Sequence, residues 1–158
     1  MSFATRRVLP YAADDLYALV ADVERYPAFV PLLTEATVQA RRPDGFDARL
    51  GVGIGFLRER WTSRVTLDRP ALRIAFHYLD GPLRALRGEW RFQPTDRATI
   101  VDFEVRWEFA SGRLDSVARR LFDVVSGRMI QAFEREARRL GRRGRMQSPS
   151  SVATGERA

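Results

Sequence analysis

The stretch TIVDFEVRWEF (Thr99–Phe109) has the most regular β-strand pattern in the chain. Apolar side chains recur at every second position and charged side chains fill the positions between them. One apolar and one polar face is typical of a strand in an antiparallel sheet. The residues predicted to face the interior are Val101, Phe103, Val105, Trp107 and Phe109.

A long helical pattern follows this strand. From Ser111, which suits an N-cap, apolar residues recur with the helical period of about 3.6 residues. The predicted helix continues to Leu140 and carries arginines on its opposite face. A sheet with one apolar face needs a cover, and this long amphipathic helix is suited to provide it. Its predicted apolar face is Leu114, Ala118, Leu121, Val125, Met129, Phe133, Ala137 and Leu140.

The remaining patterns extend this α+β arrangement toward the N-terminus. A short strand at residues 3–9 precedes a helix over residues 14–23 and a second, short helical turn at residues 25–29. Alternating stretches and turn signals then predict strands at residues 34–41, 46–53, 56–67 and 73–79, and a further strand within residues 81–94. We therefore predict a curved antiparallel sheet of seven strands around one long C-terminal helix.

Composition limits the functions that the chain supports. Its 158 residues suffice for one domain, contain no cysteine and include a single histidine, His77. These counts argue against disulfides, thiolate metal sites and histidine clusters, so we expect no metal and no required cofactor. No glycine-rich nucleotide loop or nucleophile elbow is present. The sequence therefore gives little support to an enzyme, and the lack of a secretory pattern favours a cytoplasmic protein.

Positive charge is concentrated near the C-terminus. All 27 basic residues are arginines, and six of them lie between residues 138 and 158, where Glu156 is the single acid. Because the sequence after Arg142 is rich in Ser, Gly and Arg without periodicity, we predict a domain over residues 1–141 and a basic, disordered tail over residues 142–158. Such a tail either contacts RNA or anionic lipid or is a solvated terminus.

Several stretches together resemble the coenzyme Q-binding protein family of the START-like, helix-grip superfamily. These are LPYAADDLYALVADVERYPAFVP, FLRERWTSRVTL, LDGPLRALRGEWRF and DFEVRWEF with the helix that follows, and they span residues 2–140. One departure is the pair Leu32 and Leu33, where family members often carry Trp and Cys. The same superfamily includes polyketide cyclase/dehydratase proteins and ribosome association toxins.

The resemblance implies a helix-grip domain with a deep cavity between the concave face of the sheet and the terminal helix. In the family this cavity is thought to hold ubiquinone (coenzyme Q) or a related polyprenyl lipid and to support respiratory electron transport without redox catalysis. Such a ligand needs a long apolar slot and a few hydrogen-bond donors. The same inward side chains would equally suit a filled core. The predicted cavity-lining residues are Glu59, Trp61, Phe76, Tyr78, Trp90, Phe92, Phe103, Trp107, Leu121, Val125 and Met129.

Glu59 is the most unusual of these residues. The strand FLRERWTSRV places it on the apolar row with Trp61 and Ser63, where an unpaired carboxylate would be costly. In a functional role, Glu59 would form a hydrogen bond with a ligand head group. In a structural role, it would turn outward at a bulge or pair with a buried arginine. Tyr78 is the better donor for a cavity because a phenol combines an apolar body with a hydroxyl. His77 alternates with its neighbours and falls on the outer face.

The segment DVERYPAFVPLL (Asp22–Leu33) places two prolines among large apolar side chains, which is unusual for a surface turn. In a helix-grip domain it lies near one end of the predicted cavity. It either forms an apolar lip that admits a prenyl tail and briefly touches the membrane or staples the first helix to the sheet. The predicted lip is Tyr26, Pro27, Phe29, Val30 and Pro31, followed by Leu32 and Leu33.

Two other functions remain open from the sequence. A ribosome-binding role would use the arginine-rich C-terminus to contact RNA phosphates. A cyclase-like enzyme would use Glu59 and Tyr78 as acid/base groups, although no carboxylate pair or histidine relay is evident. The expected partners are ubiquinone or another isoprenoid lipid, the inner face of the cytoplasmic membrane in a transient contact, and the ribosome.

Overall fold

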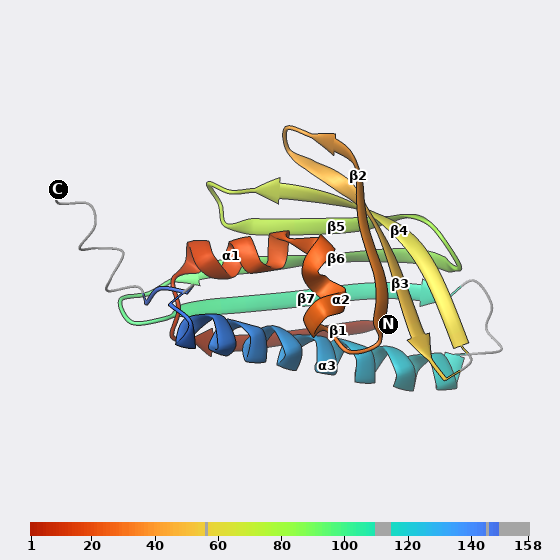
Figure 1. Cartoon of the computed structure of the whole chain (residues 1–158). Coiled ribbons are helices and arrows are strands. Elements are labelled where there is room, and N and C mark those ends of the chain that lie inside the picture. Colours follow the sequence, from red (N-terminus) through yellow and green to blue (C-terminus); the bar gives the residue numbers. More distant parts are fainter. Residues whose placement is uncertain (56, 110–114, 145, 149–158) are drawn as a thin grey trace.

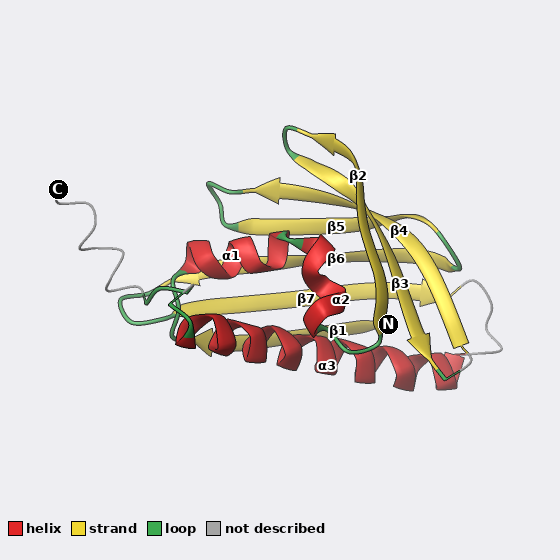
Figure 2. Ribbon diagram, in the orientation of Figure 1, coloured by secondary structure: helices red, strands yellow, loops and turns green. Residues whose placement is uncertain are grey.

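A computed structural model describes residues 1–55, 57–109, 115–144 and 146–148, apart from the side chains of residues 54, 57, 115–119 and 121. Seven antiparallel strands form one curved sheet, and the helices lie on its concave face (Figures 1 and 2). The elements are β1 (Ser2–Leu9), α1 (Ala13–Ala21), η1 (Val23–Arg25), α2 (Tyr26–Phe29), β2 (Leu33–Arg42), β3 (Gly45–Ile54), β4 (Leu57–Asp68), β5 (Arg73–Asp80), β6 (Leu83–Pro94), β7 (Thr99–Phe109) and α3 (Asp115–Arg142).

The strand order is β1-β7-β6-β5-β4-β3-β2, so β1 and β2 form the two edges. Each pair is antiparallel, and the chain returns to the first strand through the pairing of β7 with β1. The long helix α3 packs across the concave face, as Figure 1 shows. This is the predicted helix-grip arrangement, and the fold expectation is confirmed.

The inner face of α3 differs from the predicted one in its first half. Ile130 and Phe133 are buried as core residues, and Ser126 is buried one position after the predicted Val125. Val125 itself is only half-buried. Phe122 takes the inward position instead, where its ring stacks on the indole of Trp107 with 4.3 Å between centroids. The predicted positions Leu114, Ala118 and Leu121 lie outside the described residues or side chains, as does the expected cap at Ser111.

The chain after α3 corrects one sequence expectation. Met146, assigned to a disordered tail, is buried in the core. The backbone N–H of Gln147 donates to Asp15 Oδ2 at 2.8 Å, and its carbonyl accepts from the backbone N–H of Ala12 at 2.8 Å. These bonds satisfy groups around the N-terminus of α1 and hold residues 146–148 against the domain. Residues 149–158 lie outside the described part of the chain.

Helix α1 covers one end of the concave face. Its buried side chains pack in the same core as the aromatic residues of β6, and the Tyr17 ring meets Phe92 edge-on with 5.8 Å between centroids. The short helix α2 follows through η1 and lies between α1 and α3 (Figure 1). None of the described helices combines the length and the apolar character needed to cross a membrane.

Candidate functional site

Of the six buried side-chain polar atoms that have no hydrogen-bond partner among the described residues, four belong to strands and lie on the concave face of the sheet. They are Trp61 Nε1, Ser63 Oγ, Tyr78 Oη and Trp107 Nε1, and we call these four residues the polar row. The pairing of β4 with β5 places Ser63 directly opposite Tyr78. A buried polar group without a partner is costly and unusual in a native core. The polar row is therefore the part of the concave face that is suited to a polar ligand group.

Local structure explains why these atoms lie inside. Strand alternation puts Trp61 and Ser63 on the same face of β4, while Arg60 and Arg64 point outward to pair with Glu35 and Asp47. Burial raises the pKa of the Tyr78 hydroxyl, whereas the nearby backbone of Leu83 opposes this shift. Although that backbone is close, Tyr78 makes no hydrogen bond of normal geometry. Tyr78 is thus a neutral phenol whose hydroxyl can donate a hydrogen bond to a ligand acceptor.

An aromatic cluster occupies the rest of the concave face. Trp90 lies at its centre, with 4.4 Å to Phe103 and 5.2 Å to Phe133 between ring centroids. Phe92 stacks parallel to Trp90 at 6.3 Å. Phe76 lies at 6.3 Å from Phe103. Rings in these offset and edge-on arrangements attract one another as well as burying area, so the cluster is a cohesive apolar wall.

The Phe76 ring reaches the middle of the sheet because Gly88 leaves room for it. A Cβ atom at Gly88 would lie 2.4 Å from Phe76 Cζ and 2.6 Å from the carbonyl oxygen of Glu104. Any larger residue at this inward position of β6 would therefore displace the ring. Sequence reasoning missed Gly88, although a glycine within an alternating strand is a signal of close approach.

The predicted lip residues divide into packed and exposed groups. Tyr26 and Val30 are buried, and the Tyr26 hydroxyl donates a hydrogen bond to the carbonyl of Val20 in α1. Burial raises the pKa of Tyr26. Phe29 is half-buried, and its ring centroid lies 5.2 Å from that of Phe133 in α3. In this conformation α2 closes over the aromatic cluster, while the two prolines, Pro27 and Pro31, are exposed.

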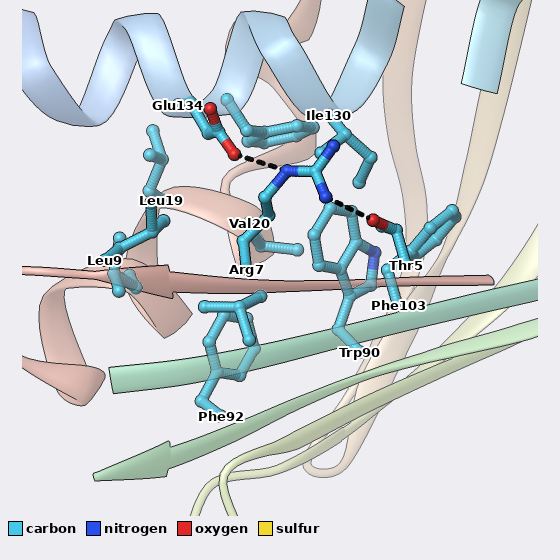
Figure 3. Close-up of a pocket in the computed structure, with 13 residues that line it drawn as sticks. Thr5, Arg7, Leu9, Leu19, Val20, Trp90, Phe92, Phe103, Ile130 and Glu134 are labelled. Atoms are coloured by element: carbon cyan, nitrogen blue, oxygen red, sulfur yellow. Dashed lines mark hydrogen bonds and ion pairs between the residues drawn. The ribbon is translucent and has the colours of Figure 1, made fainter. Parts of the chain in front are cut away.

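An apolar pocket lies beneath β1, between α1 and α3 (Figure 3). Its volume is about 30 Å³, which leaves room for no more than a few water molecules. Side chains therefore nearly fill this part of the space between sheet and helices. Sequence reasoning named Trp90, Phe92 and Phe103 as cavity lining and placed Val101 and Phe133 on inward faces, and it did not assign the other residues to a cavity. The pocket is lined by Thr5, Arg7, Leu9, Leu16, Leu19, Val20, Trp90, Phe92, Val101, Phe103, Ile130, Phe133 and Glu134.

The structure brings most of the predicted site residues together, with one clear exception. Trp61, Phe76, Tyr78, Trp90, Phe92, Phe103, Trp107 and Met129 all belong to the core or pack against it. Glu59 is exposed, so its predicted place in the cavity lining is wrong, and its carboxylate meets solvent without a register shift in the strand at this point. It lies near the N-terminal end of β4, opposite Val52 of β3. His77 is exposed, as expected for the outer face.

The buried carboxylates are on other parts of the molecule. Glu89 is buried on the outer face of the sheet, where it pairs with Arg73 and Arg91. Glu136 is buried on α3, where it pairs with Arg25 and Arg139. Neither residue was singled out from the sequence. Within the described residues, no group of three or more His, Asp or Glu side chains is placed to hold a metal ion.

Comparisons with known proteins place these features in context. A family model described as polyketide cyclase/dehydrase and lipid transport matches residues 9–134. The mitochondrial coenzyme Q-binding protein COQ10 of Drosophila melanogaster is 35% identical over 99% of this chain, which spans 65% of that protein's length. The ribosome association toxin RatA of Escherichia coli (strain K12) is 30% identical over 80% of each chain.

A solved structure supports the same fold. The 18 kDa protein CC1736 from Caulobacter crescentus is 38% identical and superposes with a TM-score of 0.75. The match covers 89% of this chain and 98% of CC1736. The similarity therefore extends through the sheet and the long helix that carry the polar row and the aromatic cluster.

Proposed function

We propose that this chain, which belongs to the polyketide cyclase/dehydrase and lipid transport family, binds a prenylated quinone of the ubiquinone type between the sheet and α3. The observation that carries the proposal is the polar row, whose four buried polar atoms lack hydrogen-bond partners among the described residues. The similarity to a protein named for coenzyme Q binding supports the choice of ligand. The quinone is carried without being chemically changed.

The chemistry of the polar row matches a quinone head group. An indole N–H only donates, so Trp61 and Trp107 require a ligand with acceptor oxygens, and the hydroxyls of Ser63 and Tyr78 can also donate. The carbonyl and methoxy oxygens of ubiquinone are acceptors and carry no charge, so their burial requires no counter-ion. The aromatic cluster offers an apolar wall for the isoprenoid chain. A ligand with a neutral oxygen-bearing ring and an apolar chain satisfies both regions.

Binding requires the closed conformation to open. Because the pocket beside the aromatic cluster holds only about 30 Å³, an isoprenoid chain must displace side chains that now fill this space. Helix α2 is the best candidate to move, since it is one turn long and covers Phe133 through Tyr26 and Phe29. Loading takes place in brief contact with the inner face of the cytoplasmic membrane, and the bound quinone supports respiratory electron transport.

Organic extraction tests the proposal most directly. Full-length protein purified from a ubiquinone-making host should release ubiquinone in near-stoichiometric amount, measured by chromatography with ultraviolet detection. The variant Tyr78→Phe removes one donor and should retain less quinone. The matched control Thr62→Ala alters the outer face of the neighbouring strand and should retain the wild-type amount. Quinone-free extracts from repeated preparations, together with no binding of added decylubiquinone, would refute the proposal.

Ribosome association is a second candidate function, favoured by the similarity to RatA and by exposed arginines at the end of α3. Arg138, Arg142 and Arg143 form no ion pair with another described residue and are free to meet RNA phosphates. Replacing these three arginines with glutamine leaves Met146 and Gln147 in place. If the chain binds ribosomal subunits, wild type should co-sediment with them in low salt and the triple variant should not. No co-sedimentation of wild type would remove this candidate.

An enzymatic cyclase role ranks behind both binding roles. The carboxylate proposed as its acid/base group, Glu59, is exposed and has no ion-pair partner among the described residues. General acid–base catalysis needs a group held within hydrogen-bond reach of the reacting atoms. Tyr78 alone, with a pKa raised by burial, is a poor base near neutral pH. Turnover of a polyketide-like substrate that is lost in Glu59→Gln would reverse this ranking.

A further inference from the structure

The outer wall of the apolar pocket consists of one ion pair. Arg7 Nε lies 2.8 Å from Glu134 Oε1, and an Arg7 Nη1 atom donates to Thr5 Oγ1 at 2.8 Å (Figure 3). Arg7 and Glu134 are 46% and 26% exposed, so one side of the pair meets water while the other side lines the pocket. A single layer of side chains therefore separates the apolar interior from solvent.

The position of Arg7 in the sheet makes this wall unusual. Phe3, Thr5, Arg7 and Leu9 alternate along β1 on the face that is turned toward α3, so a charged residue interrupts an otherwise mainly apolar row. Strand β1 is an edge strand paired only with β7, and α3 runs alongside it (Figure 1). The seam between β1 and α3 is thus bridged by side chains and not by sheet hydrogen bonds.

The pocket lies at the opposite end of the concave face from the polar row. The polar row includes Trp107 of β7. In the register of β1 and β7, Arg7 lies opposite Val101, six residues before Trp107. Six residues along an antiparallel strand span about 20 Å. A ligand whose head group meets the polar row would therefore direct its chain along the aromatic cluster toward Arg7 and Glu134.

We propose that this pocket is the subsite for the far end of the isoprenoid chain, and that the Arg7–Glu134 pair closes an opening between β1 and α3 through which longer chains project. The inference rests on the proposed quinone-binding function. The domain would then have a second opening, separate from the one beneath α2. The isoprenoid chain would run from the polar row toward this second opening.

An ion pair is well suited to close such an opening. A pair that is partly solvated contributes little stability, because water replaces the interaction when the two groups separate. Both groups remain hydrated in the open state, whereas an apolar plug would be exposed to water. The opening can therefore form at low cost when a chain fills the pocket, and the pair re-forms when the chain leaves.

Photochemical cross-linking can locate the end of the bound isoprenoid chain directly. A ubiquinone analogue with an alkyl diazirine at the end of its chain is bound to the full-length protein, irradiated, and the modified peptides are identified by mass spectrometry. We expect modification of β1 and α3 around Arg7 and Glu134. Modification confined to α2 or to β4 and β5 would overturn the inference and leave quinone binding intact. Failure of both this analogue and decylubiquinone to bind would overturn quinone binding and the inference with it.

Matched charge-removing variants test the ion pair itself. Glu134→Gln breaks the pair with Arg7, and the control Asp102→Asn breaks the 2.7 Å pair that the adjacent Arg6 makes on the outer face of the sheet. We expect Glu134→Gln to accelerate dissociation of a long-chain ubiquinone several-fold and to leave decylubiquinone unchanged. Asp102→Asn should alter neither rate. Equal effects on the two quinones, or equal effects of the two variants, would show that the pair has no role in passing the chain.

Discussion

Ser63 carries a hydroxyl that is almost fully buried and has no hydrogen-bond partner in the part of the chain that the structure describes, which costs stability in the free protein. We predict that Ser63→Ala leaves the free energy of unfolding unchanged or raises it by about 1 kcal/mol. The same change should weaken decylubiquinone binding about tenfold, equivalent to about 1.4 kcal/mol, because the ligand loses a donor. Urea unfolding and a fluorescence titration measure the two quantities.

Thr99 provides the contrast to Ser63. It is fully buried, and its hydroxyl donates to the carbonyl of Tyr11 at 2.7 Å. Thr99→Val should therefore lower the free energy of unfolding by about 1 to 2 kcal/mol, because it leaves that carbonyl unpaired, with no effect on quinone affinity. If Ser63→Ala destabilised the protein as much as Thr99→Val, Ser63 would be an ordinary core residue and not part of a ligand site.

Among the elements, α2 is the one whose movement the proposed function needs. The Phe29 ring is one of two α2 rings that contact Phe133 of α3, and Tyr26 is the other. Phe29→Ala should lower the free energy of unfolding by about 2 kcal/mol, since the ring is only half-buried, and should speed decylubiquinone exchange several-fold. Stopped-flow displacement measures the exchange rate. The control Ala28→Ser changes an exposed residue of α2 and should alter neither the free energy of unfolding nor the exchange rate. An unchanged exchange rate in Phe29→Ala would show that the quinone does not enter beneath α2.

Helix α3 and η1 are connected by a buried carboxylate. Glu136 accepts hydrogen bonds from Arg139, at 2.5 and 3.0 Å, and from Arg25 at 3.0 Å. The bond from Arg139 is the largest cause that holds the pKa of Glu136 below its usual value, and Arg25 adds to it. A carboxylate with a lowered pKa stabilises the fold above its unfolded-state pKa, and this contribution is lost as the pH falls through the folded-state pKa.

The resulting pH dependence can be measured. Near neutral pH, Glu136→Gln should be less stable than wild type by about 1 kcal/mol, since the two arginines are partly exposed and screened. The difference should shrink as the pH falls below about 4.5, the usual value for a glutamate side chain. Urea unfolding of both proteins across this range gives the two curves. A difference that stays constant with pH would mean that Glu136 contributes through packing and not through its charge.

For the whole molecule, the packing of residues 146–148 predicts that this segment stabilises the folded domain. A chain shortened to residues 1–148 keeps this segment and is the reference for the comparison. Shortening to residues 1–142 removes the buried Met146 and both hydrogen bonds of Gln147, and should cost about 3 kcal/mol. Urea unfolding separates the two cases. Equal stability of both truncated chains would show that this segment contributes nothing to the domain.

The sequence by itself determined the elements and their order, because backbone geometry is local. A period of two places Phe103 and Trp107 on one face of β7, and a period of 3.6 puts Phe133 and Ala137 on one face of α3, whatever lies opposite. The family resemblance then predicted that the sheet curves around the C-terminal helix in a helix-grip arrangement. Strand bounds, the break between α1 and α2, and the inward aromatic residues were all predictable in this way.

Only the tertiary structure decided burial and partners, because these depend on residues far apart in the chain. Glu59 and Ser63 share one face of β4 by alternation, yet Glu59 is exposed and Ser63 is buried. Glu89 follows the alternation of β6 but is buried, since Arg73 and Arg91 cover it. Tyr26 and Phe29 of the lip pack on Phe133, which lies more than 100 residues further along the chain. Periodicity assigns a side chain to a face, and only the elements brought against that face determine whether water reaches it.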